Sequence, residues 1–221
     1  MSTLIDAAKA IQEFSDKSLT QKIWGLENAF QGKDGQQVAD ILSQIALDRN
    51  LLIAGITFKQ VAGQINVLIH AVGILLSLPY ILDEGEVIEE LSLGAGNTGR
   101  HFDLATNRRI AEFKFINWKG GAESIRQNSL FKDFFYLAEY DTKKERYLYV
   151  IGALHPLRFL NGGRALSSIL TKDQKLRESF TNLYGTTYST VGEYYRFRKD
   201  RIHLEDINKF IPEFGDLYDF D

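Results

Sequence analysis

Apolar residues recur along the chain with two different periods, and each period predicts a different kind of element. In the first 56 residues the period is helical. The clearest example follows the breaker at 33–35 and consists of Val38, Ile41, Leu42, Ile45 and Ala46. Two shorter helices are predicted over 4–14 and 19–30. We expect this helical region, 1–56, to pack on the rest of the chain; a lid, a dimerisation arm and a substrate-positioning element are the alternatives.

Residues 61–82 contain no charged side chain, so the next helix is apolar nearly all round. The segment 57–60 has the form of a capping box and is predicted to begin this helix. A membrane span is one interpretation of such a segment. The residues that interrupt it are Gln64, Asn66, His70, Ser77 and Pro79. We therefore expect a core helix, and no membrane.

Beyond this helix the apolar period changes to two, which predicts strands. The expected strands are 86–93, 101–105, 109–116 and 144–153, and the expected helices are 122–140 and 172–184. The order of helix, three strands, helix and strand predicts an α/β protein. We divide the chain into the helical region 1–56, a core over 57–160, and a C-terminal α+β extension of the same domain over 161–221.

A tight hairpin is predicted where the dipeptide 107–108 separates two strands, because its asparagine tolerates the positive φ of such turns. A two-residue loop pairs Thr106 with Arg109, and counting back along both strands places Asp103 opposite Glu112. Cross-strand neighbours lie roughly 4.5–5.5 Å apart at Cβ, and like charges at that separation repel. A hard divalent cation, Mg²⁺ or Mn²⁺, would compensate them.

Lys114 follows Glu112 by two positions, so the period of the strand brings its ammonium to the same face. There it would orient an attacking water or offset charge that develops on a phosphate. The other face of the strand is apolar and continues as Phe113, Phe115 and Trp118. Charged residues on a buried strand favour a catalytic role for this hairpin. The alternative is an ordinary edge hairpin with solvated charges.

Phe102-Asp103 followed by Glu112-Phe113-Lys114 resembles the motif of the PD-(D/E)xK nuclease superfamily, with Phe in place of the usual Pro. The resemblance covers roughly residues 60–153. It implies a restriction-endonuclease-like αβββαβ core with a helical N-terminal extension. It also implies a metal ion held by Asp103, Glu112 and the backbone carbonyl of Phe113, with Lys114 as a catalytic residue that assists the attacking water.

Many members of this superfamily carry a Gln on the helix after E-x-K, and Gln127 is the matching catalytic residue here. It would bind a water or a phosphate near Lys114, or satisfy a buried backbone group. Many members also carry an acidic residue on the first helix, whereas 61–82 has none. Either the site has two protein carboxylates or a third comes from the next strand. The residues in question are Glu86, Glu89 and Glu90.

Composition narrows the classes of function. The net charge of −3 is not that of a generally basic nucleic-acid binder, so any polyanion site must be local. The absence of cysteine excludes disulfides, zinc thiolate sites and thiol catalysis, and fits a reducing cytoplasm. The four histidines lack the HxH and HExxH spacings of zinc hydrolases. With no signal peptide expected at the N-terminus, we predict a cytoplasmic protein.

Two further motifs have structural and functional interpretations. Residues 94–99 match G-x-G-x-x-G, but a strand rather than a helix follows, which favours a connection over a dinucleotide site. Residues 194–201 interleave aromatic residues with four cations, which could stack bases and contact phosphates. An amphipathic strand with exposed basic residues is the favoured interpretation.

Together these patterns predict a metal-dependent nuclease that hydrolyses phosphodiester bonds, in DNA more readily than in RNA. A role in restriction, repair or phage (antiviral) defence would suit such a protein, and a homodimer is a further expectation. One alternative is a defence or toxin-type nuclease that acts on structured RNA such as tRNA. The other is a catalytically inactive nuclease-like module that binds a partner.

Overall fold

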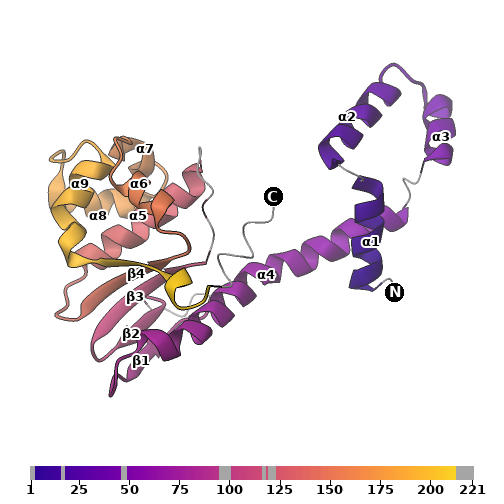
Figure 1. Ribbon diagram of the computed structural model, residues 1–221. Coiled ribbons are helices and arrows are strands. Elements are labelled where there is room, and N and C mark those ends of the chain that lie inside the picture. Colours follow the sequence, from indigo (N-terminus) through magenta and orange to yellow (C-terminus); the bar gives the residue numbers. More distant parts are fainter. Residues whose placement is uncertain are drawn as a thin grey trace. The chain divides into compact units, whose positions relative to one another are not determined.

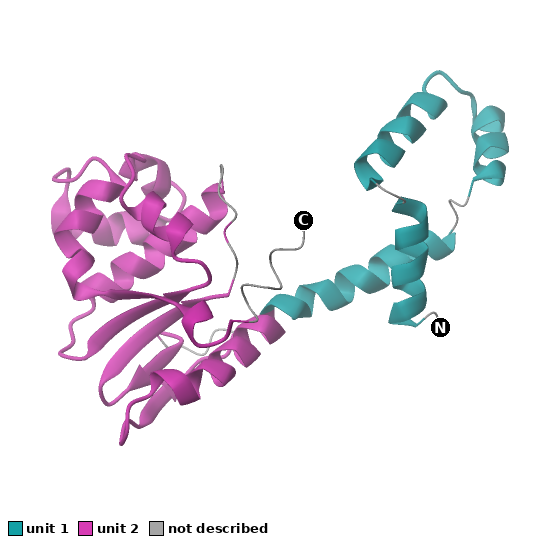
Figure 2. Ribbon diagram, in the orientation of Figure 1, with its two compact units in different colours: residues 1–66 teal, residues 67–221 magenta. Residues whose placement is uncertain are grey.

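The computed structural model describes residues 3–15, 18–45, 49–94, 101–115, 118 and 123–212. The chain divides into two compact units, 1–66 and 67–221 (Figure 2). The described part of the first unit is helical, and the second contains the sheet. The boundary between them falls inside one long helix.

The first unit contains the three helices that the apolar spacing predicts. They are α1 (Leu4–Ser15), α2 (Leu19–Phe30) and α3 (Gly35–Gln44) (Figure 1). Asp34 and Gln37 form a capping box at the start of α3, in which each side chain accepts a hydrogen bond from the other's backbone N–H. Of the described residues in these three helices, Ala7 alone is buried. Packing of this region on the rest of the chain therefore stays a prediction.

The next helix, α4 (Arg49–Ile81), is longer than the predicted one. The predicted start at 57–60 is wrong, because Thr57 lies inside the helix and its hydroxyl donates to the Ile53 carbonyl oxygen at 2.9 Å. No proline stands between 49 and 57 to interrupt the helix. By length and composition, α4 is the one helix in the described part of the chain that could cross a membrane, and 17% of its most apolar stretch is buried.

In the second unit, α4 is buried along one face only. Ile74, Ser77 and Ile81 are buried there, and the Ser77 hydroxyl donates to the Gly73 carbonyl oxygen at 2.7 Å. Other apolar positions of the same stretch are exposed, namely Val67, Leu68, Val72, Leu75, Leu76 and Tyr80. The prediction of a core helix is therefore right for one face and wrong for the remainder.

Five strands form one mixed sheet in the order β1-β2-β3-β4-β5. The strands are β1 (Ile88–Leu91), β2 (Leu104–Thr106), β3 (Arg109–Lys114), β4 (Glu145–Val150) and β5 (His203–Asp206). The first three are antiparallel neighbours, whereas β4 runs parallel to β3 and β5 parallel to β4. The α/β class and the order of elements from α4 to β4 are as predicted. Each of the four expected strands is shorter than predicted, and β5 was not predicted.

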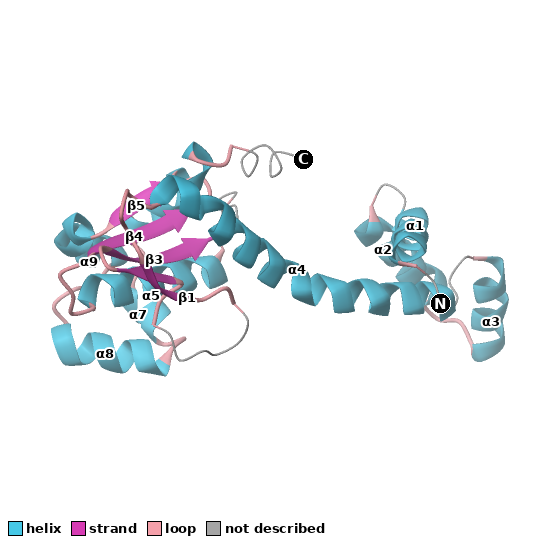
Figure 3. Ribbon diagram, turned by 90° about the horizontal axis from the view of Figure 1, so that it is seen from below, coloured by secondary structure: helices cyan, strands magenta, loops and turns pink. Residues whose placement is uncertain are grey.

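Helices cover both faces of the sheet (Figure 1) (Figure 3). One face packs on α4, where Ile74 joins Leu104 and Phe113 in a buried cluster. The other face is covered by α5 (Ser124–Glu139), α6 (Leu154–Leu160), α7 (Leu166–Leu170), α8 (Gln174–Tyr184) and α9 (Val191–Arg198). Ile110 and Leu148 point into that second cluster. Successive residues of β3 and β4 therefore face different helices, as strand geometry requires.

A close contact joins α4 to the end of β3. A Cβ atom on Gly73 would lie 2.5 Å from Cε1 of Phe115. The Phe115 ring is buried and stacked on Phe113, with ring centroids 5.8 Å apart, so it has little room to turn away. Gly73 therefore allows α4 to approach the sheet at this point.

Residues 194–201 form most of α9 and the 3₁₀ turn η1 (Lys199–Arg201), so the predicted amphipathic strand is wrong. Thr190 and Glu193 form a capping box that begins the helix. Helical spacing then buries Tyr194 and directs Arg198 to Glu139 on α5, with Nε of the arginine 2.8 Å from Oε1. A second 3₁₀ turn, η2 (Ile207–Lys209), follows β5.

Several predicted features fall on residues outside the described ranges. These are Ala46, the glycine-rich connection after Gly94, Ile116 and the residues after 212. Gly94 itself has a φ of 79°, which favours glycine.

Candidate active site

The β2–β3 hairpin has the register that the sequence predicts. Ala105 pairs with Ile110, so Thr106 and Arg109 flank a two-residue turn at 107–108. The Thr106 hydroxyl accepts a hydrogen bond from the Arg109 N–H at 2.8 Å, which closes the turn. The same register, continued by two positions, brings Asp103 level with Glu112.

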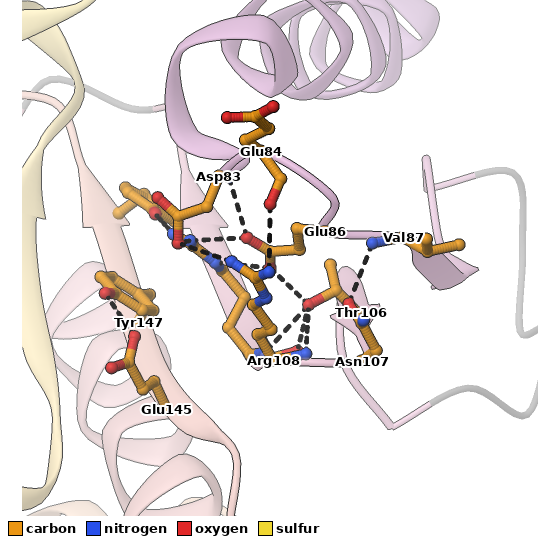
Figure 4. Close-up of polar contacts among 11 residues, drawn as sticks. Asp83, Glu84, Glu86, Val87, Thr106, Asn107, Arg108, Glu145 and Tyr147 are labelled. Atoms are coloured by element: carbon orange, nitrogen blue, oxygen red, sulfur yellow. Dashed lines mark hydrogen bonds and ion pairs between the residues drawn. The ribbon is translucent and has the colours of Figure 1, made fainter.

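A buried salt bridge occupies the turn end of β3, where Asp83, Glu86 and Thr106 converge (Figure 4). The Arg109 guanidinium donates to both carboxylate oxygens of Glu86, each at 2.7 Å, and to Asp83 at 2.8 Å. It also donates to the Tyr149 hydroxyl at 3.4 Å. Burial opposes ionisation of Glu86, but hydrogen bonds from Arg109 and Thr106 outweigh it and lower the pKa of this carboxyl. We call these residues the arginine cluster.

The arginine cluster decides against Glu86 as a third acidic ligand near Lys114, because Glu86 is engaged at the opposite end of β3. Glu89 instead forms an ion pair with Lys144 at 2.5 Å, and Glu90 is exposed. In this structure no side chain from β1 joins Asp103 and Glu112 as a third carboxylate.

Asp103 lies at the end of the hairpin where the pairing of β2 with β3 stops. Because β2 begins at Leu104 and the residues before it bend, the first part of the predicted strand 101–105 is wrong. The Asp103 Oδ2 atom accepts a hydrogen bond from the Phe113 N–H at 3.0 Å. Its Oδ1 atom lies 3.2 Å from Nε2 of His70 on α4. The carboxylate is therefore held between a strand and a helix.

Glu112 and Lys114 lie on the α5 side of β3, as the two-residue period predicts. Lys114 Nζ is 3.9 Å from Oε2 of Glu112 and 2.6 Å from Oδ2 of Asp133, which projects from α5. The shorter contact is an ion pair, and Oδ2 of Asp133 is buried. A single ammonium thus serves two buried carboxylates.

The surroundings shift the pKa values of Glu112, Asp133 and Lys114. Burial raises the pKa of Glu112, and the neighbouring carboxylates of Asp133 and Asp103 raise it further. Burial also raises the pKa of Asp133, against the pull of Lys114. For Lys114, the charges of Asp133 and Glu112 outweigh the effect of burial and raise the pKa well above its ordinary value. Lys114 is consequently a permanent cation at neutral pH.

The residues Asp103, Glu112, Asp133, Lys114 and His70 form what we call the carboxylate cluster. Its three carboxylates exceed its one permanent cation; Lys132, which pairs with Asp173, also lowers the pKa of Asp133 without forming an ion pair with it. An excess of negative charge inside a protein is costly unless a proton or a cation joins it. Carboxylate oxygens are the ligands that Mg²⁺ and Mn²⁺ prefer. As they stand, the described side chains include no group of three or more His, Asp or Glu residues arranged to hold a metal ion.

Asp133 and His70 were not predicted from the sequence as residues of this site. Asp133 stands three positions after Leu130 and four before Leu137, both of which are buried. A carboxylate between buried positions on a helix was the available signal. His70 is one of the few polar residues in the uncharged part of α4, but its contact with Asp103 depends on how helix and strand meet.

Gln127 lies on α5, as predicted, and is half-buried. Its side chain makes no hydrogen bond with another residue that the structure describes. The structure therefore brings Asp103, Glu112 and Lys114 together, but shows no hydrogen bond between Gln127 and any of these three residues. The role of the Phe113 carbonyl stays a prediction.

Comparison with known proteins gave no match among protein-family models, curated proteins or solved structures.

Proposed function

We propose that this chain is a metal-dependent nuclease that hydrolyses phosphodiester bonds, with DNA as the first substrate to consider and structured RNA such as tRNA as the second. The observation that carries the proposal is the excess of buried negative charge in the carboxylate cluster. A buried carboxyl with a raised pKa, next to two others and a fixed cation, is an arrangement typical of functional sites. Restriction, repair and phage defence are the roles that suit such an activity.

The order of elements supports a restriction-endonuclease-like core as the finer description of the fold. In α4, β1, β2, β3, α5 and β4 the chain has the order that the PD-(D/E)xK resemblance implies. Glu112 and Lys114 stand on the third strand, and Asp103 directly precedes the second. His70 comes from the first helix, which carries an acidic residue in many members of that superfamily.

Asp103 and Glu112 would hold Mg²⁺ or Mn²⁺, with the Phe113 carbonyl as a further ligand. The donor chemistry fits a hard cation, because Lys114 is the one lysine or arginine among the described residues that forms an ion pair in the carboxylate cluster. Such an ion supplies a bound water of lowered pKa and neutralises charge on the phosphate. Lys114, which stays protonated, would orient the water and stabilise the anionic phosphate oxygens rather than accept a proton.

A catalytically inactive binding module is the second candidate function. The observation in its favour is that the polar groups already have partners within the chain. Asp103 is occupied by His70 and the Phe113 N–H, and Lys114 is paired with Asp133. In such a module the carboxylate cluster would serve only to join α4 and α5 to the sheet.

Cleavage assays with matched variants separate the two candidates. The wild type, Glu112→Gln and a surface control, Glu178→Gln on α8, are incubated with plasmid, linear DNA and total tRNA in Mg²⁺, Mn²⁺ or EDTA. A nuclease predicts cleavage by the wild type and by Glu178→Gln in either metal, with none in EDTA. Glu112→Gln should lose at least about a thousandfold in rate, equivalent to roughly 4 kcal/mol of transition-state stabilisation.

Cleavage that persists in Glu112→Gln would move the active site away from the carboxylate cluster. Absence of cleavage by the folded wild type on every substrate and metal would favour the binding module.

A further inference from the structure

Beside the carboxylate cluster lies a cavity of about 170 Å³ between the ends of β3 and β4 and the first half of α5. Its lining includes Lys114, Trp118, Arg126, Leu130, Val150 and Pro156. We propose that this cavity binds one unpaired nucleobase of the substrate, so that the enzyme acts on single-stranded or locally opened nucleic acid. The proposal rests on the nuclease function and specifies its substrate class.

The size of the cavity suits one aromatic ring system. An apolar cavity of about 150 Å³ in another protein takes up a single benzene ring, whereas pockets for drug-sized ligands run from about 300 to 1,000 Å³. The cavity is therefore large enough for a base and too small for a base pair. A base that is stacked and paired in a duplex cannot enter it without leaving the helix.

The chemistry of the walls also suits a base attached to a phosphate. Trp118, Leu130 and Val150 are buried apolar residues that offer flat and branched surfaces to a ring. Lys114 and Arg126 add two cations to a lining that is otherwise apolar except for Ser129. Arg126 is paired with Glu123 at 2.5 Å, a partly exposed contact that a phosphate could replace.

Lys114 connects the cavity to the chemistry, because it both lines the cavity and pairs with Asp133 and Glu112. A base in the cavity would therefore hold its own phosphate next to the carboxylate cluster. Single-stranded nucleic acid is commonly bound in this way, by stacking on aromatic residues and by contacts of cations with phosphates.

Trp118 fluorescence tests the proposal without any cleavage. The chain has two tryptophans, so Trp24→Phe leaves Trp118 as the sole indole emitter. This variant is titrated in EDTA with deoxyadenosine and thymidine 5′-monophosphates, and separately with deoxyribose 5-phosphate and inorganic phosphate. We expect saturable quenching by the nucleotides and none by the two ligands that lack a base.

A cavity-filling substitution sharpens the test. Ser129 is exposed and lines the cavity, so Ser129→Phe should place its ring there and weaken nucleotide binding at least about tenfold. Ser167→Phe, at an exposed position of α7, is the matched control and should bind as the parent does. Equal quenching by sugar phosphate, or equal binding by both variants, would overturn the proposal.

A cleavage comparison keeps this inference distinct from the nuclease function. The wild type is given one oligonucleotide sequence as a single strand and as a duplex, in Mg²⁺. Faster cleavage of the single strand, lost in Ser129→Phe and kept in Ser167→Phe, supports the cavity as the base site. Equal cleavage of both forms, unaffected by Ser129→Phe, would retain the nuclease and reject the base site. Base-dependent quenching without cleavage of any substrate would instead remove the nuclease function.

Discussion

At the two ends of β3, the pKa values of carboxyl groups are shifted in opposite directions. At the turn end, Arg109 donates to both oxygens of Glu86, whose side chain has no exposed surface and whose pKa is lowered. At the far end, Lys114 serves Glu112 and Asp133 together, and the pKa of both carboxyls is raised. The side chains of Arg109 and Lys114 also point to opposite faces of the sheet, because residues 109 and 114 differ by an odd number of positions.

Two glutamates, one at each end of β3, therefore differ in their partners. Glu86 receives a two-pronged guanidinium and a hydroxyl, which completes its hydrogen bonding. Glu112 has carboxylates as neighbours and shares its one cation. A complete cluster stabilises a fold, whereas an incomplete one leaves charge for something else to neutralise. The difference identifies the far end of β3 as the place where a ligand is expected.

The largest expected effect comes from replacing Lys114, and the matched comparison is the replacement of Arg109 at the other end of β3. Lys114→Met should reduce metal-dependent cleavage by about a hundredfold to ten-thousandfold, because it removes the group that orients water and offsets phosphate charge. Arg109→Met should leave the rate per folded molecule unchanged. Initial rates, corrected for the folded fraction by circular dichroism, give the comparison. Equal losses would mean that the two ends do not differ in function.

Substitutions in the arginine cluster should lower the free energy of unfolding more than substitutions in the carboxylate cluster. Glu86→Gln leaves the buried guanidinium of Arg109 without its charged partner and should lower the free energy of unfolding by about 3 kcal/mol. Urea denaturation measures the change. A loss below about 1 kcal/mol would show that Asp83, the other carboxylate on Arg109, compensates by itself.

A bound metal should stabilise the protein through the far end of β3 only. At a Mg²⁺ or Mn²⁺ concentration of about 100 times the dissociation constant, the free energy of unfolding should rise by about 2.7 kcal/mol. Glu86→Gln should keep this increment, and Glu112→Gln should lose it. Thermal unfolding with and without EDTA reads both, and an increment that survives in Glu112→Gln would place the metal elsewhere.

The smallest effect has the opposite sign to that of Glu86→Gln. Glu112 has a raised pKa in the folded protein, so its ionised form costs stability above that pKa. Glu112→Gln should therefore stabilise the protein by roughly 0.5–2 kcal/mol near pH 8.

The sign of the pH dependence follows from the same shift. As pH falls toward the ordinary carboxyl value of 4.5, Glu112 protonates first in the folded state, and the advantage of the variant disappears. Unfolding curves at several pH values measure this convergence. A constant difference at all pH values would mean that packing, not charge, separates the two proteins.

The part of the site that lies on one hairpin could be predicted from the sequence. A two-residue turn fixes register, and register fixes which residues face each other, so Asp103 and Glu112 follow from counting. Asp133 and His70 could not be found in this way, because their contacts depend on how α5 and α4 pack on the sheet. Gln127 shows the converse: its place on α5 was predicted correctly, whereas a contact with a water or a phosphate near Lys114 stays a prediction.

The fold shows the same division. Period and breakers predicted α1 to α3 and α5, whereas residues 194–201 were assigned to a strand from their alternation alone. The capping box formed by Thr190 and Glu193 lies just before that segment and was the local signal for a helix. The burial of Tyr194 in the core then stabilises the helix that the capping box begins.

Gly73 has a consequence for how freely this protein can change its sequence. His70 stands one helical turn before it and packs edge-on against the same Phe115 ring, with centroids 5.9 Å apart. A single added methyl group at position 73 would push α4 away from the ring, and the imidazole would move away from Asp103 with it. Gly73 touches no proposed ligand, but it allows α4 to lie close enough to the sheet for His70 to contact Asp103. Substitutions at this position would be tolerated only together with a smaller residue at 115.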